Sequence, residues 1–470
     1  MLNLLNNPAN RNKIVVFAGD IILITVLAFA VAALRDLFAT YHVPRVFAQP
    51  LKVRAIGASF VICVFTLYIL GLYDMDKMGE KSGRPAIVAR LVLTGFFSML
   101  LTFTFSKILI INKTTAAYLF LCYSACIAVL YGWRVFFRKV FLKSGHFSKR
   151  VLFVGRDELT GEILEGIKGS GYIVAGSLSG NGEGGKFCDP GSRILGTIEE
   201  LDTLADNRRM DVVVFSRNTK ILSGTLKNIQ KYRQNGIELY KSAVFYENLT
   251  RKTAIKHFML EEGSVLPHIP LHSNRVFCKT KRLMDFFGAL FIFIVLLPVF
   301  AFIAVLIKIT SKGPVFYFQK RLGLYEKPFT LIKFRTMFTG AEDKNGPQWS
   351  IKGDPRITAI GRILRRGRLD ELPQLINIIK GELSFVGPRP IRQYFAETIE
   401  KRVPFYSMRF NIKPGISGWA QVHYDYGGSV EGHIEKFQYD LYYIKHASLF
   451  LDLFVILKTF QTLACRPADR

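Results

Sequence analysis

The sequence predicts a membrane protein of mixed class: a four-helix transmembrane region, a parallel α/β middle domain and a mixed α/β carboxyl-terminal domain with a reentrant membrane helix. Three observations predict this fold class. Long apolar stretches fill the first third of the 470 residues, strand and helix patterns alternate after Arg150, and Pro298 interrupts a later apolar run. The predicted parts are 1–145, 146–255, a linker over 256–278, and 279–470.

Composition narrows the classes of function. Half of the residues are hydrophobic and the formal net charge is +27. A soluble protein this basic would suggest nucleic acid, but here much of the charge borders apolar segments. This favours anionic membrane lipid or phosphorylated substrates as partners, and no nucleic acid. The six cysteines are scattered and form no CxxC or Cys/His ligand set, so we expect neither a thiol metal site nor a disulfide framework.

Four apolar stretches in the first third each have about the length needed to cross a bilayer. They lie at roughly 14–34, 55–72, 91–111 and 116–133. The densest basic cluster, which begins at Arg134, follows the fourth stretch, although the loop 35–54 also carries four basic residues. By the positive-inside rule, we expect four spans with both ends in the cytoplasm. Asp20 lies in the first span, where a carboxylate is either functional or simply tolerated near a helix end.

The middle region alternates strand and helix patterns, which predicts a parallel α/β domain. The strand candidates are 151–154, 172–178, 211–215 and 236–240, with a helix over 159–167. A strand followed by a glycine turn is compatible with dinucleotide binding. However, Gly155 and Gly161 stand alone, without a GxGxxG pattern. The alternative is a Rossmann-like scaffold for regulation or oligomerisation.

The apolar run 283–309 has Pro298 near its middle and basic residues on both flanks. A proline inside a helix removes a backbone hydrogen bond and forces a bend. The run is therefore either a kinked fifth span or a helix-break-helix that enters one leaflet and returns. Basic residues at both ends favour the second interpretation, because both ends then lie at the same cytoplasmic surface.

Asp370 and Glu371 are adjacent carboxylates directly after an arginine-rich helix. The preceding arginines are Arg362, Arg365, Arg366 and Arg368. Nearby guanidinium groups favour the ionised form of a carboxylate. An ionised aspartate can be a nucleophile, and arginines can hold phosphate oxygens in a bidentate grip. The simpler alternative is a salt-bridged helix start in which Glu371 and Pro373 are ordinary first-turn residues.

Other polar positions surround this pair in the sequence. Lys333 and Arg335 end a strand pattern, Arg356 follows an Asp-Pro turn, and Arg389 is fixed between Pro388 and Pro390. Further on, 413–422 predicts a turn and then a strand. Aromatic-rich amphipathic helices are expected over 439–445 and 449–463, either in a membrane interface or packed in a core.

Residues 279–463 resemble the bacterial sugar transferase family, the monotopic phosphoglycosyl transferases that begin polysaccharide assembly on polyprenyl phosphate. The matching motifs, all in family order, are Lys281-Arg282-Leu283-Met284-Asp285, Gly313-Pro314-Val315-Phe316, Lys333-Phe334-Arg335-Thr336-Met337, Asp354-Pro355-Arg356, Asp370-Glu371-Leu372-Pro373-Gln374, Gly387-Pro388-Arg389-Pro390 and Lys413-Pro414-Gly415. The layout of the first part resembles the large WbaP-like subgroup, whose middle domain is CoA-binding-like, and the last part resembles exopolysaccharide-associated members.

This resemblance implies a covalent transfer. Asp370 attacks the β-phosphate of a UDP-sugar, UMP leaves, and undecaprenyl phosphate takes the phosphosugar from Asp370. Glu371 binds Mg²⁺ or handles the acceptor's proton, Arg365 orients the pair, and Arg389 contacts the nucleotide. Further expected substrate-binding positions are Pro388, Pro390, Gln374, Lys333, Arg335 and Arg356. For the last three, a structural salt bridge is the alternative.

The resemblance also implies a location and partners. A break at Pro298 would hold the catalytic domain on the cytoplasmic face of the bacterial inner membrane, in contact with membrane lipid. Glucose, galactose and N-acetylated sugars all fit as the sugar, with glucose or galactose favoured. A homodimer through the extra domains is one option. The alternative function is a catalytically inactive membrane scaffold that recruits other polysaccharide enzymes through 150–250.

Overall fold

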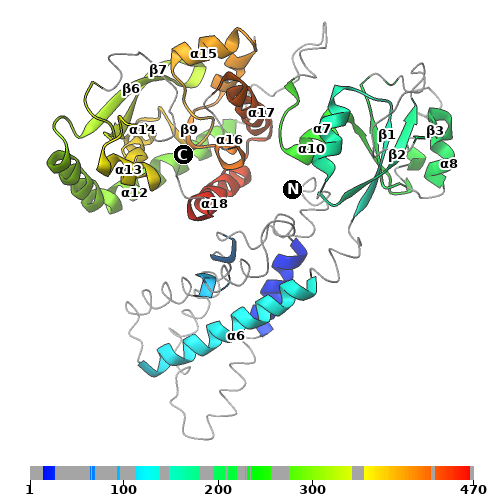
Figure 1. Ribbon diagram of the computed structural model, residues 1–470, viewed down its shortest axis with the longest axis horizontal. Coiled ribbons are helices and arrows are strands. Elements are labelled where there is room, and N and C mark those ends of the chain that lie inside the picture. Colours follow the sequence, from blue (N-terminus) through cyan, green and yellow to red (C-terminus); the bar gives the residue numbers. More distant parts are fainter. Residues whose placement is uncertain are drawn as a thin grey trace, which may run out of the picture. The chain divides into compact units, whose positions relative to one another are not determined.

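The structure is a computed structural model (Figure 1). Apart from isolated gaps and a few positions between 64 and 95, it describes residues 14–26, 113–137, 148–179, 194–206, 210–219, 228–255, 275–340, 354–424 and 429–465. The chain divides into two compact units, Met1–Thr250 and Arg251–Arg470, and each is described by itself.

The first unit begins with two apolar helices, Ile14–Val26 and α6 (Lys113–Phe137). Asp20 and Arg134 form a buried ion pair, in which Nη1 and Nη2 of Arg134 donate to the two carboxylate oxygens at 3.0 and 2.8 Å. Arg134 therefore lies inside the helix pair, although the sequence pattern placed it at the start of a flanking basic cluster. Losing either partner would leave a buried charge uncompensated, at a cost of about 3–5 kcal/mol.

A helix must be both long and apolar to cross a bilayer. Across the described ranges, no single helix is both long and apolar enough to cross a membrane. The two limbs of α12 (Arg275–Thr310) meet the requirement together. The predicted spans 55–72 and 91–111 lie almost wholly outside the described residues. The four-span region therefore stays a prediction.

A five-stranded parallel sheet forms the rest of the first unit, which confirms the predicted parallel α/β domain. Its strands, in the order β3-β2-β1-β4-β5, are β1 (Lys149–Val154), β2 (Tyr172–Ser179), β3 (Ile194–Thr197), β4 (Val212–Phe215) and β5 (Glu238–Lys241). The accompanying helices are α7 (Glu158–Ile167), η3 (Ile198–Glu200), α8 (Leu201–Asp206) and α10 (Ser242–Thr250). Only β3 was not predicted, because it is a short edge strand with a glycine inside it.

The strand order reverses between β1 and β4, the place where sheets of this type bind ligands beyond their carboxyl ends. Asp157 fills this place. Its carboxylate accepts hydrogen bonds from Leu159 N and Thr160 Oγ1, which cap α7, and from Arg217 N and Ser242 Oγ. The amino end of α7, where a phosphate would bind, is thus occupied by the chain's own carboxylate. This arrangement favours the scaffold interpretation of the sheet domain.

The second unit begins with a short segment packed on its own core. Trp419 Nε1 donates to Arg251 O at 3.0 Å, Thr253 N donates to Gln438 O at 3.1 Å, and Ile255 is buried. The sequence pattern had assigned this segment to the middle domain. Its buried contacts, however, are with α16 (Trp419–His423) and α17 (Val430–His446).

α12 has 36 residues and bends by 62° between limbs Arg275–Val295 and Leu297–Thr310. The bend lies just before Pro298, whose ring crowds the preceding turn and which donates no backbone hydrogen bond. The helix starts at Arg275 rather than at the predicted Leu283, because the basic residues between them are good helix formers.

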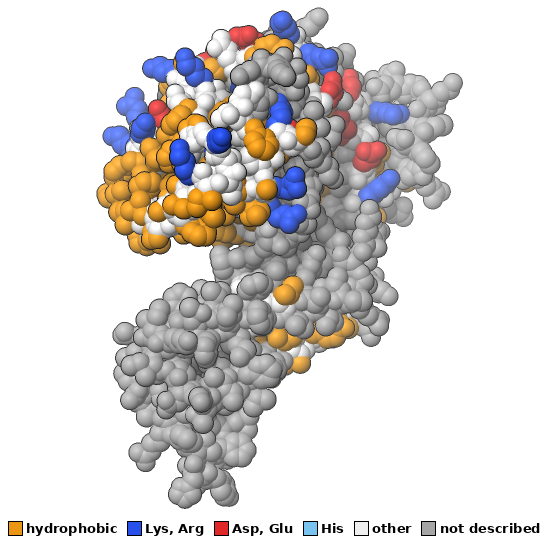
Figure 2. All heavy atoms as spheres, turned by 60° about the vertical axis from the view of Figure 1, so that its left-hand side comes forward, with side chains coloured by type: hydrophobic (Ala, Val, Ile, Leu, Met, Phe, Trp, Pro, Cys, Tyr) orange, Lys and Arg blue, Asp and Glu red, His pale blue; other side chains and the backbone are white. Residues whose placement is uncertain are grey.

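One side of α12 is exposed and apolar. Phe291, Phe302 and Ile309 are 69%, 64% and 77% exposed, and Figure 2 shows hydrophobic side chains gathered over one face of this unit. The other side packs inward: Phe300 contacts the ring of Phe334, and both belong to one buried cluster. An exposed apolar area of this kind marks an interaction surface, for a protein partner or for a membrane.

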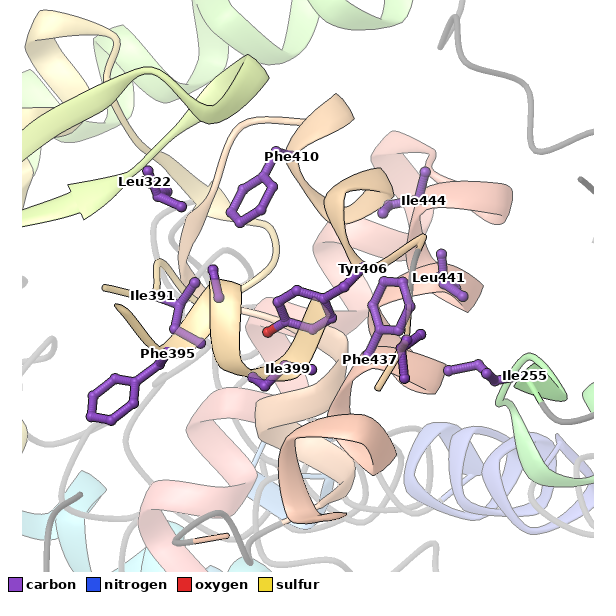
Figure 3. Close-up of a cluster of buried hydrophobic side chains, with 12 residues drawn as sticks. Ile255, Leu322, Ile391, Phe395, Ile399, Tyr406, Phe410, Phe437, Leu441 and Ile444 are labelled. Atoms are coloured by element: carbon purple, nitrogen blue, oxygen red, sulfur yellow. The ribbon is translucent and has the colours of Figure 1, made fainter. Parts of the chain in front are cut away.

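Short strands and helices complete the second unit around three clusters of buried hydrophobic side chains among its described residues. An antiparallel pair joins β6 (Phe316–Leu322) to β7 (Pro328–Phe334), and a parallel pair joins β8 (Ser384–Val386) to β9 (Gly415–Ser417). The remaining helices are η4 (Leu324–Glu326), α13 (Ala359–Arg366), η5 (Leu369–Glu371), α14 (Gln374–Lys380), α15 (Gln393–Glu400), η6 (Tyr406–Asn411) and α18 (Leu449–Cys465). Figure 3 shows one of these clusters, called the second core below. In it, the side chains of Tyr406 and Phe437 pack against each other.

Two expectations for this end of the chain change. The segment 413–422, predicted as a turn and then a strand, contains the short strand β9 but continues into the helix α16, where Trp419 packs its ring against Tyr442 of α17. The two carboxyl-terminal helices also differ. α17 is core, with Phe437, Leu441 and Tyr443 buried, whereas α18 leaves Phe450 55% exposed.

Candidate active site

Asp370 and Glu371 lie in η5, on a tight connection between α13 and α14. Thr358 Oγ1 caps α13 by accepting from Gly361 N at 3.0 Å. The connection then passes through Arg368, which has a φ of 51°. A left-handed conformation at a residue other than glycine is costly and clusters at functional sites. The turn leaves both carboxylate residues only 8% exposed.

Glu371 is held by two cations through one of its oxygens. Its Oε1 accepts from Lys333 Nζ at 3.1 Å and from Arg389 Nη2 at 2.6 Å. Burial alone would raise the pKa of Glu371, but the charges of Arg389 and Lys333 outweigh burial and hold this pKa well below its usual range. Glu371 therefore stays ionised and serves as the charged centre of the site.

Asp370 has a different environment, although it is the neighbour of Glu371. Among the described residues, no hydrogen-bond donor reaches its carboxylate. Burial raises the pKa of Asp370, and the nearby positive charge of Lys333 offsets part of that rise. The negative charge of Glu371 raises the pKa further. A carboxylate that is buried, near cations and without a hydrogen bond is poorly stabilised, and it is therefore available to react.

The loop 387–390 positions Arg389 by backbone contacts on both sides. Gly387 N donates to Ser417 O, and Gly415 N donates to Pro388 O, each at 2.9 Å. A Cβ on Gly387 would lie 2.3 Å from the carbonyl oxygen of Lys413, so only glycine allows this close approach. The guanidinium of Arg321 donates to Pro390 O at 3.3 Å. The Pro-Arg-Pro segment is thereby fixed beside Glu371.

A buried asparagine fixes the strand that carries Lys333. Asn377 of α14 accepts from Ile332 N at 3.1 Å, and its Nδ2 donates to Thr330 O and to Glu382, each at 2.7 Å. These bonds tie α14 to β7. Lys333 thus faces Glu371 at a fixed distance, and burial lowers the pKa of Lys333.

The remaining predicted site residues divide into two groups. Arg365 and Gln374 are close to the carboxylate pair, whereas Arg335 and Arg356 bond to other groups of the chain. Arg365 lies near the pair: its Nε donates to Thr336 Oγ1 at 2.9 Å, and its charge acts to lower the pKa of Asp370. Gln374 is buried at the start of α14, four residues after Asp370. In contrast, Arg335 donates to the carbonyls of Lys312 and Ser311, at 2.6 and 2.9 Å.

Arg356 belongs with Arg335. Its guanidinium pairs with Asp354, two residues earlier, with Nη2 lying 2.5 Å from Oδ2. Arg356 Nε and Asp354 Oδ1 are 2.8 Å apart. The hydrogen bonds found for Arg335 and Arg356 therefore favour the structural alternative. A role for either in substrate binding stays a prediction.

The residues present fit a magnesium site with few protein ligands. Nowhere in the described ranges do three or more His, Cys, Asp or Glu side chains gather as a metal-binding group. Mg²⁺, however, commonly uses one or two protein carboxylates together with substrate phosphates and water. Asp370 and Glu371 supply such a pair, and both cations that bind Glu371 contact Oε1 rather than Oε2.

Two polar residues that contact the elements of the site were not predicted from the sequence. Asn377 had a signal, since it is a polar residue within the apolar run Ile376-Asn377-Ile378. Arg409 had none: it lies outside the quoted motifs, yet its guanidinium donates to the carbonyl oxygen of Arg389 at 2.9 Å. Chemically, the site combines one free carboxylate, one cation-bound carboxylate and several arginines, which suits transfer of a phosphorylated group.

Comparisons with known proteins agree with this chemistry. The family model described as "Bacterial sugar transferase" matches residues 276–466. The chain is 37% identical over 228 residues to the Aeromonas hydrophila protein "UDP-N-acetylgalactosamine-undecaprenyl-phosphate N-acetylgalactosaminephosphotransferase", covering 48% of this chain and 52% of that protein. It is also 37% identical over 213 residues to "UDP-glucose:undecaprenyl-phosphate glucose-1-phosphate transferase" of Escherichia coli, covering 44% and 45%.

These two matches span about half the length of each relative. A shorter relative is covered more fully. The Caulobacter vibrioides protein "UDP-glucose:undecaprenyl-phosphate glucose-1-phosphate transferase" is 36% identical over 206 residues, which are 43% of this chain and 74% of that protein. The matched segment contains α12, the carboxylate pair and the Pro-Arg-Pro loop. The chain therefore belongs to the bacterial sugar transferase family.

Proposed function

We propose that this protein transfers a sugar 1-phosphate from a UDP-sugar to undecaprenyl phosphate through a covalent intermediate on Asp370. The products are UMP and an undecaprenyl-diphosphate-sugar, and the reaction starts the assembly of an exopolysaccharide, O-antigen or capsule. One observation carries the proposal: Asp370 is buried among cations but accepts no hydrogen bond from the described residues. The names of the relatives support the choice of donor and acceptor.

The first step forms one bond and breaks another. A carboxylate oxygen of Asp370 attacks the β-phosphorus of the UDP-sugar, and the bond to the bridging oxygen breaks. UMP leaves with that electron pair, and an aspartyl-phosphosugar remains. In the second step, a phosphate oxygen of undecaprenyl phosphate attacks the same phosphorus, and Asp370 leaves as a carboxylate. Positioning and neutralisation of charge supply most of the catalysis in such transfers.

The cations of the site divide this work. Arg389, between its two prolines, contacts the nucleotide and holds Glu371, while Lys333 lowers the cost of keeping both carboxylates ionised. Arg365 orients the pair from α13. Gln374 and the backbone around Pro388 and Pro390 shape the nucleotide site.

Of the two roles open for Glu371, we favour metal binding. A general base works best when its pKa is near the operating pH, whereas the pKa of Glu371 lies well below its usual range. Glu371 would hold Mg²⁺, which neutralises phosphate charge when it is bound. Glu371 itself fixes Arg389 and Lys333 through Oε1.

We also propose that α12 is a reentrant helix and that the first unit carries four spans, so that the active site faces the cytoplasm of a bacterial inner membrane. The support is the 62° bend, together with the exposed apolar side of α12 and the apolar side chains of α18. A reporter fused after Arg470 should give a cytoplasmic signal. A periplasmic signal would contradict this topology. Dimerisation through the first unit stays a prediction.

The decisive assay for the function is UMP release by purified protein in lipid nanodiscs. The panel contains UDP-glucose, UDP-galactose, UDP-N-acetylglucosamine and UDP-N-acetylgalactosamine, each with undecaprenyl phosphate. We expect release with at least one donor, and glucose or galactose are our first choices. Failure with every donor, in protein that binds membranes normally, would favour the alternative of an inactive scaffold.

A further inference from the structure

We propose that Arg409 is a positioning residue that fixes the orientation of Arg389, with Asp440 as its buried counter-charge. This inference rests on the proposed function, because it assigns Arg389 to the nucleotide. Arg409 lies in η6 and Asp440 in α17, and neither was predicted from the sequence as a site residue. Both side chains are almost completely buried, at 5% and 2% exposure.

The guanidinium of Arg409 joins three elements at one point. Its Nη2 donates to Arg389 O and to Asp440 Oδ2, each at 2.9 Å. Its Nη1 donates to the hydroxyl of Tyr406, whose ring lies in the second core (Figure 3). The carbonyl of Arg389 is thereby connected to a buried hydrophobic core of the unit.

This carbonyl matters because of the two prolines beside it. Proline fixes its own φ and donates no backbone hydrogen bond, and a residue before proline is restricted as well. Neither proline can donate a backbone hydrogen bond, so the carbonyl oxygen of Arg389 adds an anchor to those already made through Gly387 N, Pro388 O and Pro390 O. On the other side of the same residue, the guanidinium of Arg389 lies 2.6 Å from Glu371. Arg409 thus acts on the charged centre of the site through one residue.

A charged group performs this task because the contact is buried. A hydrogen bond that involves an ionised group is about twice as strong as a neutral one. The buried guanidinium in turn requires an anion, which Asp440 supplies. Burial raises the pKa of Asp440 to about 6, and the positive charge of Arg409 opposes that rise.

The competing explanation is that the pair only stabilises the fold. Phe437 provides a matched control, because its ring packs on Tyr406 with 4.9 Å between centroids in the same core. Phe437→Leu loosens this core without removing a polar contact to the loop. The exposed pair Arg402–Glu431, 60% and 69% exposed, offers a second control that affects neither the core nor the loop.

The test is a double-mutant cycle on the affinity for UMP, measured by calorimetry on the full chain in nanodiscs, so that no turnover is needed. The variants are Arg409→Met, the milder Arg409→Lys and Asp440→Asn, each alone and combined with Arg389→Ala. We expect Arg409→Met to weaken UMP binding by about ten- to a hundredfold. Arg409→Lys should recover part of this loss. In the Arg389→Ala background, none of these three substitutions should change the affinity for UMP much further.

Phe437→Leu separates positioning from stability. We expect this variant to lower the midpoint of thermal unfolding by as much as Arg409→Lys does, while UMP affinity changes less than twofold. Equal loss of affinity in the two variants, or additive losses for Arg409→Met and Arg389→Ala, would overturn the inference. UMP release by the wild-type protein is measured separately. Release without coupling refutes only this inference, whereas coupling without release refutes only the proposed transfer.

Discussion

Asp157 in the sheet domain and Asp370 in the second unit are both buried carboxylates, at 7% and 8% exposure, beside a tight turn and the start of a helix. Asp157 accepts four hydrogen bonds from its own domain. Asp370 accepts none from the described residues. The first carboxylate is satisfied by hydrogen bonds within its own domain, whereas the second is buried without a hydrogen bond from the described residues.

This difference shows how to separate a structural acid from a reactive one. Unpaired buried polar groups are costly, so proteins keep them where function requires them. The cost at Asp370 appears as a pKa raised by burial, and the same environment gives Glu371, which has two cationic partners, a lowered pKa. Position within the fold is therefore less informative than the set of donors around each carboxylate.

The substitutions Asp370→Asn and Asp157→Asn should show the largest difference in the rate of UMP release. Asp370→Asn should lower the rate of UMP release by at least about 10⁴-fold, because the nucleophile is lost. Asp157→Asn should leave that rate within twofold of wild type. Both rates are measured in the nanodisc assay with the preferred UDP-sugar. Substantial activity in Asp370→Asn would contradict the assignment of the nucleophile.

Arg389→Ala should have the second largest effect, about a hundredfold in kcat/KM, since it removes a charge-assisted hydrogen bond and a nucleotide contact together. Arg321→Gln, which changes a neighbouring arginine that contacts Pro390 O, serves as the control. We expect its effect to be below about fivefold. An equal loss in both variants would mean that the loop's general geometry, rather than the charge on Arg389, is important.

The pH profile of the rate tests the raised pKa of Asp370. The reaction needs ionised Asp370, so the rate should fall as the pH falls through this pKa, which lies above the ordinary value. The charge of Lys333 lowers the pKa of Asp370, and Lys333→Gln should therefore move the acid limb of the rate to higher pH. An unchanged limb, or one that moves to lower pH, would show that another group controls it.

The smallest predicted effect concerns stability alone. Asp157→Ala removes the cap of α7 and leaves Arg217 N and Ser242 without their acceptor. The free energy of unfolding should fall by about 1–3 kcal/mol, measured by denaturant titration. Because Asp157 lies in the sheet domain, kcat/KM for UMP release should not change. A parallel loss of activity would mean that the sheet domain takes part in the reaction.

The sequence predicts local features of this molecule well. Apolar runs and glycine turns predict the strands β1, β2, β4 and β5, and Pro298 predicts a broken helix near the observed bend. The arginine-rich approach to Asp370 also indicates a charged site. Each of these signals lies within a short window, where periodicity and turn chemistry operate.

Contacts between distant residues could not be predicted in the same way. Asp20 and Arg134 are 114 positions apart, and Lys333 and Glu371 are 38 apart. No local pattern specifies which cation meets which carboxylate, so Arg335 and Lys333 look equivalent in the sequence although only Lys333 contacts Glu371. The helix α16 was missed for a related reason, since packing of Trp419 on α17 overrides its local strand preference.

The most direct test of the account is to capture the covalent intermediate. Purified protein is incubated with the preferred UDP-sugar and Mg²⁺ without acceptor, digested, and examined by mass spectrometry. We predict a sugar-phosphate adduct on the peptide that contains Asp370, absent from Asp370→Asn and discharged when undecaprenyl phosphate is added. An adduct on another residue, or turnover by an Asp370→Asn protein, would contradict the central claim.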